Sequence, residues 1–164
     1  MSKDPMHDLG SEVPVVRPAV PDDLAPVERL LTASDLPLDG VREALGDFVV
    51  ADAGGEVVGV AGLECCDGEA LLRSVAVAPE WRSRGLGRAL VTRVISDAEA
   101  RGIRALYLLT NTAERYFPSF GFRTVSRDEV PASVRGTVEF SGACPASATV
   151  MCRECAASSS APVA

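Results

Sequence analysis

The sequence predicts a single domain of the α/β (α+β) class, in which a central mixed β-sheet of about six to seven strands is flanked by about four helices. Two observations lead to this class. Three β-rich runs separated by short turns precede a strand–helix–strand unit, whose two strands are normally parallel. A hydrophobic content of 47% over 164 residues is sufficient for one core. We expect the domain at residues 13–153, between a flexible tail at 1–12 and a disordered low-complexity tail at 154–164.

The N-terminal part is expected to begin with a strand at residues 13–17. Pro21 and the two acidic residues after it are typical of a helix start, and the apolar residues that follow recur at helical spacing until about Ser34. These apolar residues are Leu24, Val27, Leu30 and Leu31. Residues 35–46 contain turn formers around a short helical piece, which either lines a ligand pocket or connects two elements.

Three antiparallel strands are expected next, at residues 48–51, 56–63 and 70–78. Their β-rich runs are separated by the turn-forming sequences Ala53-Gly54-Gly55 and Asp67-Gly68. The third strand leads through Pro79 into a loop rich in Arg and Gly.

This loop opens an amphipathic helix and has the properties of a phosphate-binding site. Gly85 and Gly87 lack the Cβ atoms that keep an anion away from main-chain N–H groups, and the first N–H groups of a helix are free to bind anions. The helix dipole contributes only about 0.3–1 kcal/mol per exposed charge, so nearby cations must supply the rest. The candidates are Arg82, Arg84, Arg88 and Arg93. The alternative is a solvated helix face in a chain that prefers Arg to Lys.

The rest of the chain completes the sheet. The helix keeps one apolar face until Arg101-Gly102, and its apolar residues are Leu86, Ala89, Leu90, Val94, Ile95 and Ala98. A strand buried on both faces is expected at residues 103–109, parallel to the strand that ends at Val77. Residues 111–114 have capping-box spacing, which predicts a helix of about two turns up to Phe120. Further strands are expected near residues 122–126 and 148–152.

The overall charge limits the partners. A net charge of −7 argues against nucleic-acid or anionic-membrane binding, because either needs a basic face. We find no apolar run of the length that spans a bilayer and no secretory signal in the polar first residues, so we expect a cytoplasmic protein. Cys152 and Cys155 form one CxxC pair, but the spacing of Cys65, Cys66 and Cys144 does not complete a zinc set. We therefore expect thiols and no metal.

The order of elements and the Arg/Gly loop together resemble the GNAT superfamily of acyl-CoA-dependent N-acetyltransferases. The sequence Arg82-Ser83-Arg84-Gly85-Leu86-Gly87 matches the Arg/Gln-x-x-Gly-x-Gly/Ala loop of this family, and Gly121-Phe122 lies at the expected later position. The resemblance implies acetyl-CoA as the acyl-donor cosubstrate, with its pantetheine arm on the strand and its pyrophosphate on the loop. The implied coenzyme-binding residues are Val75, Ala76, Val77, Arg82, Ser83, Arg84, Gly85, Leu86, Gly87, Arg88, Asn111 and Phe117.

A narrower resemblance links the chain to the GNAT enzymes encoded among arsenic-resistance genes (ArsN-type). It rests on the segments at residues 71–75, 112–117 and 139–151. It implies a small amino-acid-like amine as substrate, such as an arsenical (arsinothricin) or a phosphinothricin-like compound. Non-catalytic acyl-CoA sensing and acetylation of proteins or peptides are the alternatives. Many members of the superfamily dimerise, so a homodimer is a further expectation from the resemblance.

Two charged residues are the candidates on the acceptor side. Glu64 ends a central strand and is the candidate base or substrate ligand. The only histidine, His7, lies in the tail, so a carboxylate is the candidate for the base. An exposed Glu at a strand end is the alternative. Arg73 lies inside an apolar strand, on the face expected for Val75 and Val77, and suits a substrate carboxylate or oxyacid. A structural ion pair with Glu64 or Glu69 is the alternative. Ser74 and Thr110 complete the predicted substrate-binding set.

The usual general acid of this family is missing from its usual place. Many GNAT enzymes carry a Tyr four residues before the Gly of the Gly-Phe pair, where it protonates the coenzyme A thiolate, and here that residue is Phe117. Tyr116 lies one residue earlier, which is a rotation of about 100° around a helix. We therefore expect its side chain to point away from the site.

Overall fold

A seven-stranded mixed sheet forms the centre of the computed structural model, which describes residues 13–66, 68–111, 113–137, 140 and 148–155. The strand order is β1-β2-β3-β4-β5-β7-β6, and only the β4–β5 pair is parallel. The strands are β1 (Val15–Pro18), β2 (Phe48–Ala53), β3 (Glu56–Cys66), β4 (Glu69–Val77), β5 (Ala105–Thr110), β6 (Arg123–Val125) and β7 (Thr149–Glu154). The expected fold class is confirmed.

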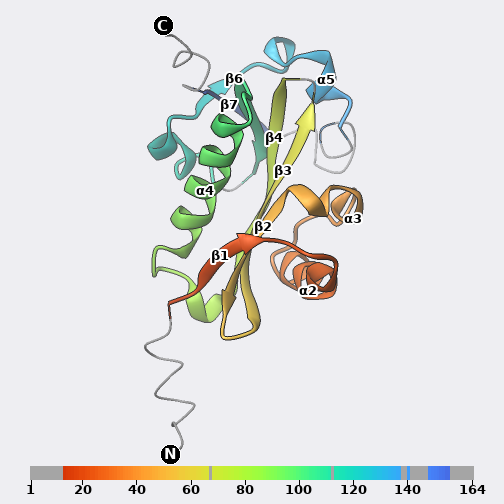
Figure 1. Ribbon diagram of the computed structural model, residues 1–164. Helices are drawn as coiled ribbons and strands as arrows, with labels where there is room; N and C mark the ends of the chain where they lie inside the picture. The colour runs from red at the N-terminus through yellow and green to blue at the C-terminus, as the bar shows by residue number, and fades with distance from the viewer. Residues whose placement is uncertain (1–12, 67, 112, 138–139, 141–147, 156–164) are drawn as a thin grey trace, which may run out of the picture.

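The helices cover both faces of this sheet. α4 lies along one face, while α2 and α3 lie on the other (Figure 1). The helices are α2 (Leu24–Ala33), α3 (Val41–Ala44), α4 (Leu86–Ala100) and α5 (Ala132–Arg135), with 3-10 turns η1 (Pro21–Asp23), η2 (Leu45–Asp47), η3 (Pro79–Trp81), η4 (Phe117–Phe120) and η5 (Arg127–Glu129). β4, η3, α4 and β5 form the predicted strand–helix–strand unit with parallel strands.

Three details differ from the sequence prediction. The two-turn helix expected up to Phe120 is only a 3-10 turn, η4, because Pro118 has no N–H to donate to the carbonyl four residues earlier and so cannot continue an α-helix. On α4, Ala89 is exposed and Val91 is buried in its place. β7 runs one residue past the predicted domain end at 153. The predicted tails lie largely outside the described residues, as does Cys144.

A β-bulge in β4 overturns the expected face of Arg73. Gly62 of β3 pairs with Arg73, but Val60 pairs with Ala76, so β4 carries one extra residue there. Ser74 sits in this bulge with a φ of 61°. Arg73 therefore lies on the α2 and α3 side of the sheet. The partly buried Val75 and Val77 pack into the core under α4.

The apolar core has a part on each side of the sheet. Under α4 it contains Leu90, Val94 and Leu106, and on the opposite side α2 packs Val27 and Leu31 against the sheet. β5 is buried from Ala105 to Leu108, as the sequence predicted. Gly62 allows the ring of Phe48 to cross β3, since a Cβ on Gly62 would lie 2.4 Å from that ring. These contacts hold β4 between two packed layers.

The edge strand β1 is protected by Pro18 and by Arg93 of α4. Pro18 has no N–H, and Arg93 donates to the Val16 carbonyl at 3.1 Å while it also pairs with Asp97. Arg93 therefore belongs to this edge, and the expectation that it joins the Arg/Gly loop is wrong. The other three arginines remain near the loop.

A buried carboxylate fixes the start of α2 to the sheet. Asp23 accepts hydrogen bonds from Arg17 at 2.8 and 3.1 Å and from the Val20 N–H at 2.8 Å, and Arg17 also pairs with Asp52 of β2. The hydrogen bonds from Arg17 hold the pKa of Asp23 below its usual value, against the opposing effect of burial. The pair ties α2 to β1 and β2.

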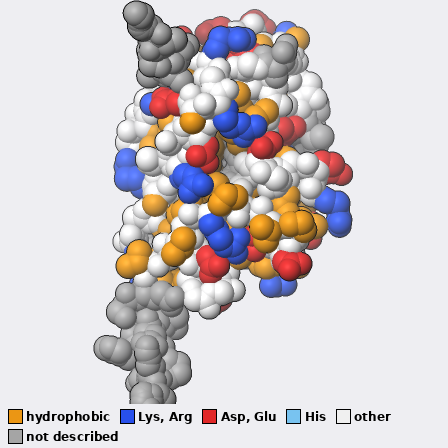
Figure 2. Space-filling model, viewed as in Figure 1, with side chains coloured by type: hydrophobic (Ala, Val, Ile, Leu, Met, Phe, Trp, Pro, Cys, Tyr) orange, Lys and Arg blue, Asp and Glu red, His pale blue; other side chains and the backbone are white. Residues whose placement is uncertain are grey.

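The face of the molecule shown in Figure 2 is mixed in charge. Acidic and basic side chains are interspersed on it, with apolar side chains between them in its lower half. No helix in the described part of the chain is both long enough and apolar enough to cross a membrane.

Asp23→Asn is expected to lower the free energy of unfolding by about 2 kcal/mol at pH 7, because it removes a charge-assisted pair. A lowered folded pKa means that the carboxylate stabilises the fold fully above about pH 5 and stops doing so as pH falls through the unfolded pKa near 3.9 and then the folded pKa. Urea unfolding from pH 3 to 7 should therefore show the wild-type advantage shrinking toward acid. The exposed neighbour Asp22→Asn is the control, and a pH-independent difference would contradict this role.

Candidate functional site

The Arg/Gly loop after β4 forms a concave, N–H-rich surface at the start of α4. Ser83 and Gly85 both have left-handed backbones, with φ of 65° and 83°. Left-handed residues in a turn can direct backbone N–H groups into a concave surface that binds anions. Gly85 is the N-cap of α4 and has no side-chain cap, so the first N–H groups of the helix remain available. The backbone of this loop is thus compatible with the predicted phosphate site.

The arginines around this loop have separate contacts. Arg82 donates to the Val77 carbonyl at 3.0 Å, and Arg88 lies over the Phe120 ring while it donates to the Ser119 hydroxyl at 3.0 Å. Arg84 turns away and stacks over Trp81. Arg82 and Arg88 line the cavity at the loop, together with Val75, Ala76, Val77, Ser83, Gly85, Gly87 and Tyr116.

A second cavity opens where β4 and β5 separate. The two strands pair only from Glu69 to Leu71, although β4 continues to Val77 and β5 to Thr110. Apolar side chains form most of the wall, and the polar part comes from β4, Thr110 and Tyr116. The lining residues are Leu36, Leu72, Arg73, Ser74, Val75, Leu108, Leu109, Thr110, Ala113, Tyr116 and Phe117. The cavity lies between strands that the fold holds apart.

Tyr116 and Val75 line both cavities, so the cavity at the anion loop and the strand opening adjoin each other, and the two together are called the channel below. The Tyr116 ring packs edge-on against Phe117 and Phe120, with ring centroids 5.2 and 5.3 Å apart. Burial raises the pKa of Tyr116, while the Arg88 charge opposes the rise. The expectation that Tyr116 points away from the site is wrong. Because Phe117 packs into the core under α4, its neighbour is left on the channel side.

Arg73, which lines the strand opening, forms an ion pair with Glu64, which lines neither this opening nor the loop cavity. The Arg73 side chain is 0% exposed and its Nη1 lies 3.3 Å from Glu64 Oε1, while Glu64 is 23% exposed. Arg73 Nε also donates to the Ser74 hydroxyl at 3.1 Å, so the bulge residue helps to hold the guanidinium. The sequence had left this ion pair open as an alternative to substrate binding, and the geometry is compatible with both.

A third cavity lies behind Glu64 and is lined by acidic residues. The segment at residues 35–46, which the sequence left open as pocket lining or connection, contributes to two cavities: Leu36 to the strand opening and Asp39 and Glu43 to this third one. Asp47, Glu64 and Cys65 complete its charged and polar wall. Glu64 therefore separates an acidic cavity from the guanidinium of Arg73.

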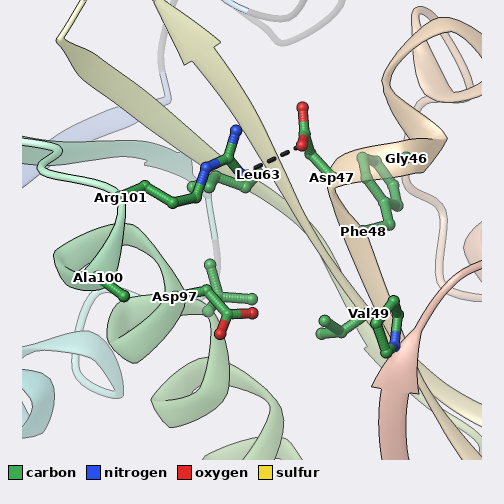
Figure 3. A pocket seen from close by; sticks show the side chains of 10 residues that line it. Gly46, Asp47, Phe48, Val49, Leu63, Asp97, Ala100 and Arg101 are labelled. Carbon is green, nitrogen blue, oxygen red and sulfur yellow. Dashed lines mark hydrogen bonds and ion pairs between the residues drawn. The ribbon is translucent and has the colours of Figure 1, made fainter.

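A fourth cavity, between the C-terminal half of α4 and the start of β2, lies apart from the channel. Asp47 and Arg101 face each other across it and form an ion pair at 3.1 Å, and Phe48, Val49 and Leu63 form its apolar side (Figure 3). Asp97 at its rim is paired with Arg93. Its charged side chains are thus engaged with protein partners.

Besides Glu64 at the third cavity and Arg84 over Trp81, two more predicted residues do not line the channel. Asn111 is exposed in a bend after β5. The side chain of Leu86 is buried under α4, so only its main chain faces the loop. The predicted site residues did not include six residues that line the channel, which are Leu36, Leu72, Leu108, Leu109, Ala113 and Tyr116. The adjacency of Tyr116 and Phe117 was the available signal, because one of two neighbours must leave the core.

The described cysteines are free thiols. Burial raises the pKa of Cys66 to about 11 and also raises those of Cys152 and Cys155. Among the described residues no group of three or more His, Cys, Asp and Glu side chains is arranged to hold a metal ion.

Residues 44–124 match the family model of the acetyltransferase (GNAT) domain. An amino-acid acetyltransferase of Aeromonas salmonicida is 28% identical over 128 residues, which are 77% of this chain and 27% of that protein. The chain therefore spans about a quarter of this relative.

Two solved structures share the fold. N-acetylglutamate synthase of Neisseria gonorrhoeae, complexed with coenzyme A and N-acetyl-glutamate, superposes with a TM-score of 0.75 at 22% identity, over 87% of this chain and 35% of that one. A Mycobacterium tuberculosis protein in complex with coenzyme A superposes with a TM-score of 0.74 at 24% identity, over 86% and 99%. At these identities the comparison establishes the fold alone.

The two loop glycines are expected to respond differently to alanine. Gly85→Ala should lower the free energy of unfolding by about 1–2 kcal/mol, because an L-residue is strained at a φ of 83°. Gly87→Ala should be neutral or stabilising, since Ala favours helix and the Cβ would meet only the movable Tyr116 hydroxyl, at 3.2 Å, and Val77 Cγ2 at 3.8 Å. Urea denaturation measures both. Equal losses would contradict the assigned backbone geometry.

Proposed function

Because residues 44–124 form a GNAT acetyltransferase domain, we propose that the chain transfers an acetyl group from acetyl-CoA to the primary amine of a small amino-acid-like substrate. The observation that carries this proposal is the pair of adjoining cavities at the anion loop and at the opened strands, which share Val75 and Tyr116 as lining residues. One end suits a diphosphate, the middle suits an amide-containing arm, and the other end has a buried guanidinium.

The donor is proposed to lie along this channel. The N–H groups at the start of α4, with Arg82 and Arg88, would hold the diphosphate. Val75 and Val77 would offer main-chain groups to the pantetheine arm. For the Val77 carbonyl this requires Arg82 to exchange its present hydrogen bond for one to the diphosphate.

The acceptor is proposed to meet Arg73, and the amino-acid acetyltransferase relative supports this substrate class. A planar guanidinium binds a carboxylate or another oxyacid through two parallel hydrogen bonds. Such a group entering the strand opening would share Arg73 with Glu64, while Ser74 and Thr110 supply further polar contacts. Arsenical and phosphinothricin-like amino acids carry oxyacid groups of this kind and are the proposed specific substrates. The 71–75 segment, which resembles arsenic-resistance acetyltransferases, supports them.

The chemistry needs a neutral amine beside the thioester and a proton acceptor. The amine nitrogen forms a bond to the acetyl carbon, the carbon–sulfur bond breaks, and the thiolate leaves with the electron pair. Glu64 is the proposed acceptor of the amine proton. Since Glu64 lies behind Arg73, the proton would travel through water. The acidic cavity behind Glu64 would attract the cationic form of the amine before it loses its proton.

The test is thiol release from acetyl-CoA with a panel of amines. It should include standard amino acids, phosphinothricin-like and arsenical amino acids, a polyamine, an aminoglycoside and a basic peptide. Turnover is expected with the amino-acid-like compounds. Turnover of only the polyamine or aminoglycoside would overturn the substrate class, and turnover of only the peptide would favour a peptide acetyltransferase. Coenzyme binding with no turnover of any amine would favour a non-catalytic sensor.

Arg73→Lys is expected to raise the KM for an oxyacid-bearing acceptor at least tenfold, because an ammonium cannot reproduce the bidentate contact. The KM of a simple primary amine should change much less. Arg104→Lys is the matched control, since Arg104 pairs with Glu69 near the surface at 2.7 Å, outside the channel. Steady-state kinetics with both acceptors shows whether the rise in KM is confined to the oxyacid-bearing one. An equal loss for both acceptors would reduce Arg73 to a structural partner of Glu64.

Glu64→Gln is expected to lower kcat by roughly 10²–10⁴, the usual range for a lost proton acceptor, with little change in the KM for acetyl-CoA. Circular dichroism should verify the fold, and Glu69→Gln serves as a carboxylate control on the neighbouring strand. An unchanged kcat with a raised acceptor KM would make Glu64 a ligand of the substrate ammonium and not the base.

A further inference from the structure

The Tyr116 hydroxyl lies on the anion side of the channel. A Cβ built on Gly87 would be 3.2 Å from this oxygen and 3.8 Å from Val77 Cγ2, so the hydroxyl lies next to the first turn of α4. Its ring is anchored edge-on against Phe117 and Phe120, and the side chain is 38% exposed. The phenol thus reaches across from η4 to the helix start.

The other groups around this hydroxyl are those of an anion site. Arg82, Arg88, Gly85 and Gly87 line the same cavity as Tyr116. Arg88 is held over the Phe120 ring, 4.5 Å from its centroid, and by Ser119, so its guanidinium stays near the Tyr116 ring. Arg73 lines the strand opening and Glu64 lines the third cavity, and neither lines the loop cavity. Tyr116 also lines the strand opening, but its hydroxyl lies beside the first turn of α4, among the residues proposed to bind the diphosphate.

We propose that Tyr116 donates its phenolic hydrogen to the diphosphate of the coenzyme A donor, and that it makes the site favour diphosphate-bearing donors over plain pantetheine thioesters. This deepens the proposed function and rests on it. The phenol stays protonated at neutral pH, so it is a permanent donor. A phenol beside the helix start supplies the neutral hydrogen bond that complements the cations there. In this role Tyr116 positions the donor and does not protonate the departing thiolate.

Binding of coenzyme A and of pantetheine to wild type and Tyr116→Phe tests the proposal. Calorimetry gives the Kd of coenzyme A, and ligand-observed NMR gives the weaker Kd of pantetheine. Tyr116→Phe is expected to raise the Kd of coenzyme A about tenfold, as for a lost hydrogen bond to a charged group, and to leave that of pantetheine unchanged. Tyr107→Phe, at the buried Tyr of β5 on the far side of the sheet from α4, should change neither.

Three outcomes would overturn the proposal. An unchanged Kd of coenzyme A would show that Tyr116 makes no hydrogen bond to the diphosphate. An equal rise in the Kd values of coenzyme A and pantetheine would mean that Tyr116 acts only through ring packing. A kcat loss of 10² or more at saturating acetyl-CoA, with a changed alkaline limb of the pH profile, would make Tyr116 the thiolate acid. If wild type binds no coenzyme A, the proposed function fails as a whole, which is distinguishable from failure of the Tyr116 role alone.

Discussion

The separation of β4 and β5 after Leu71 is the constraint on which the site depends. Parallel pairing covers only Glu69–Leu71, and beyond it two layers of core keep the strands apart: α4 on one face, α2 and α3 on the other. Adjacent strands in a continuous sheet are about 4.8 Å apart, which leaves no room for a ligand. The opening therefore exists because β4 pairs with β3, β5 pairs with β7, and the two pairs diverge.

The bulge at Ser74 gives this opening two chemically different sides. It turns Arg73 toward the α2 and α3 face, where Glu64 meets it, and leaves Val75 and Val77 beside the loop at the start of α4. A regular strand would have placed all three on one face. One extra residue in β4 thus separates the Arg73 guanidinium, on the proposed acceptor side, from Val75 and Val77, on the proposed donor side.

Much of this arrangement was predictable from sequence, because periodicity and glycine placement act locally. The Arg82–Gly87 loop, the span of α4 and the parallel β4–β5 pair followed from such signals. The bulge did not, since Ser has no particular preference for a positive φ and only tertiary packing enforces it. Tyr116 was misplaced because its segment was treated as an α-helix, whereas the chain forms the 3-10 turn η4 with Pro118 at its start, which rotates the side chains differently. Arg93 was assigned to the loop from its nearness in sequence, although a helix turn directs it to the edge of β1.

Hydrogen–deuterium exchange with and without coenzyme A tests the central claim most directly, because it reports which amides the donor covers. New protection is expected at Val75, at Val77 and across residues 82–88, with little change around Asp47 and Arg101, whose cavity lies at the other end of α4. Protection around Asp47 and Arg101, with none at the loop, would contradict the proposed donor site.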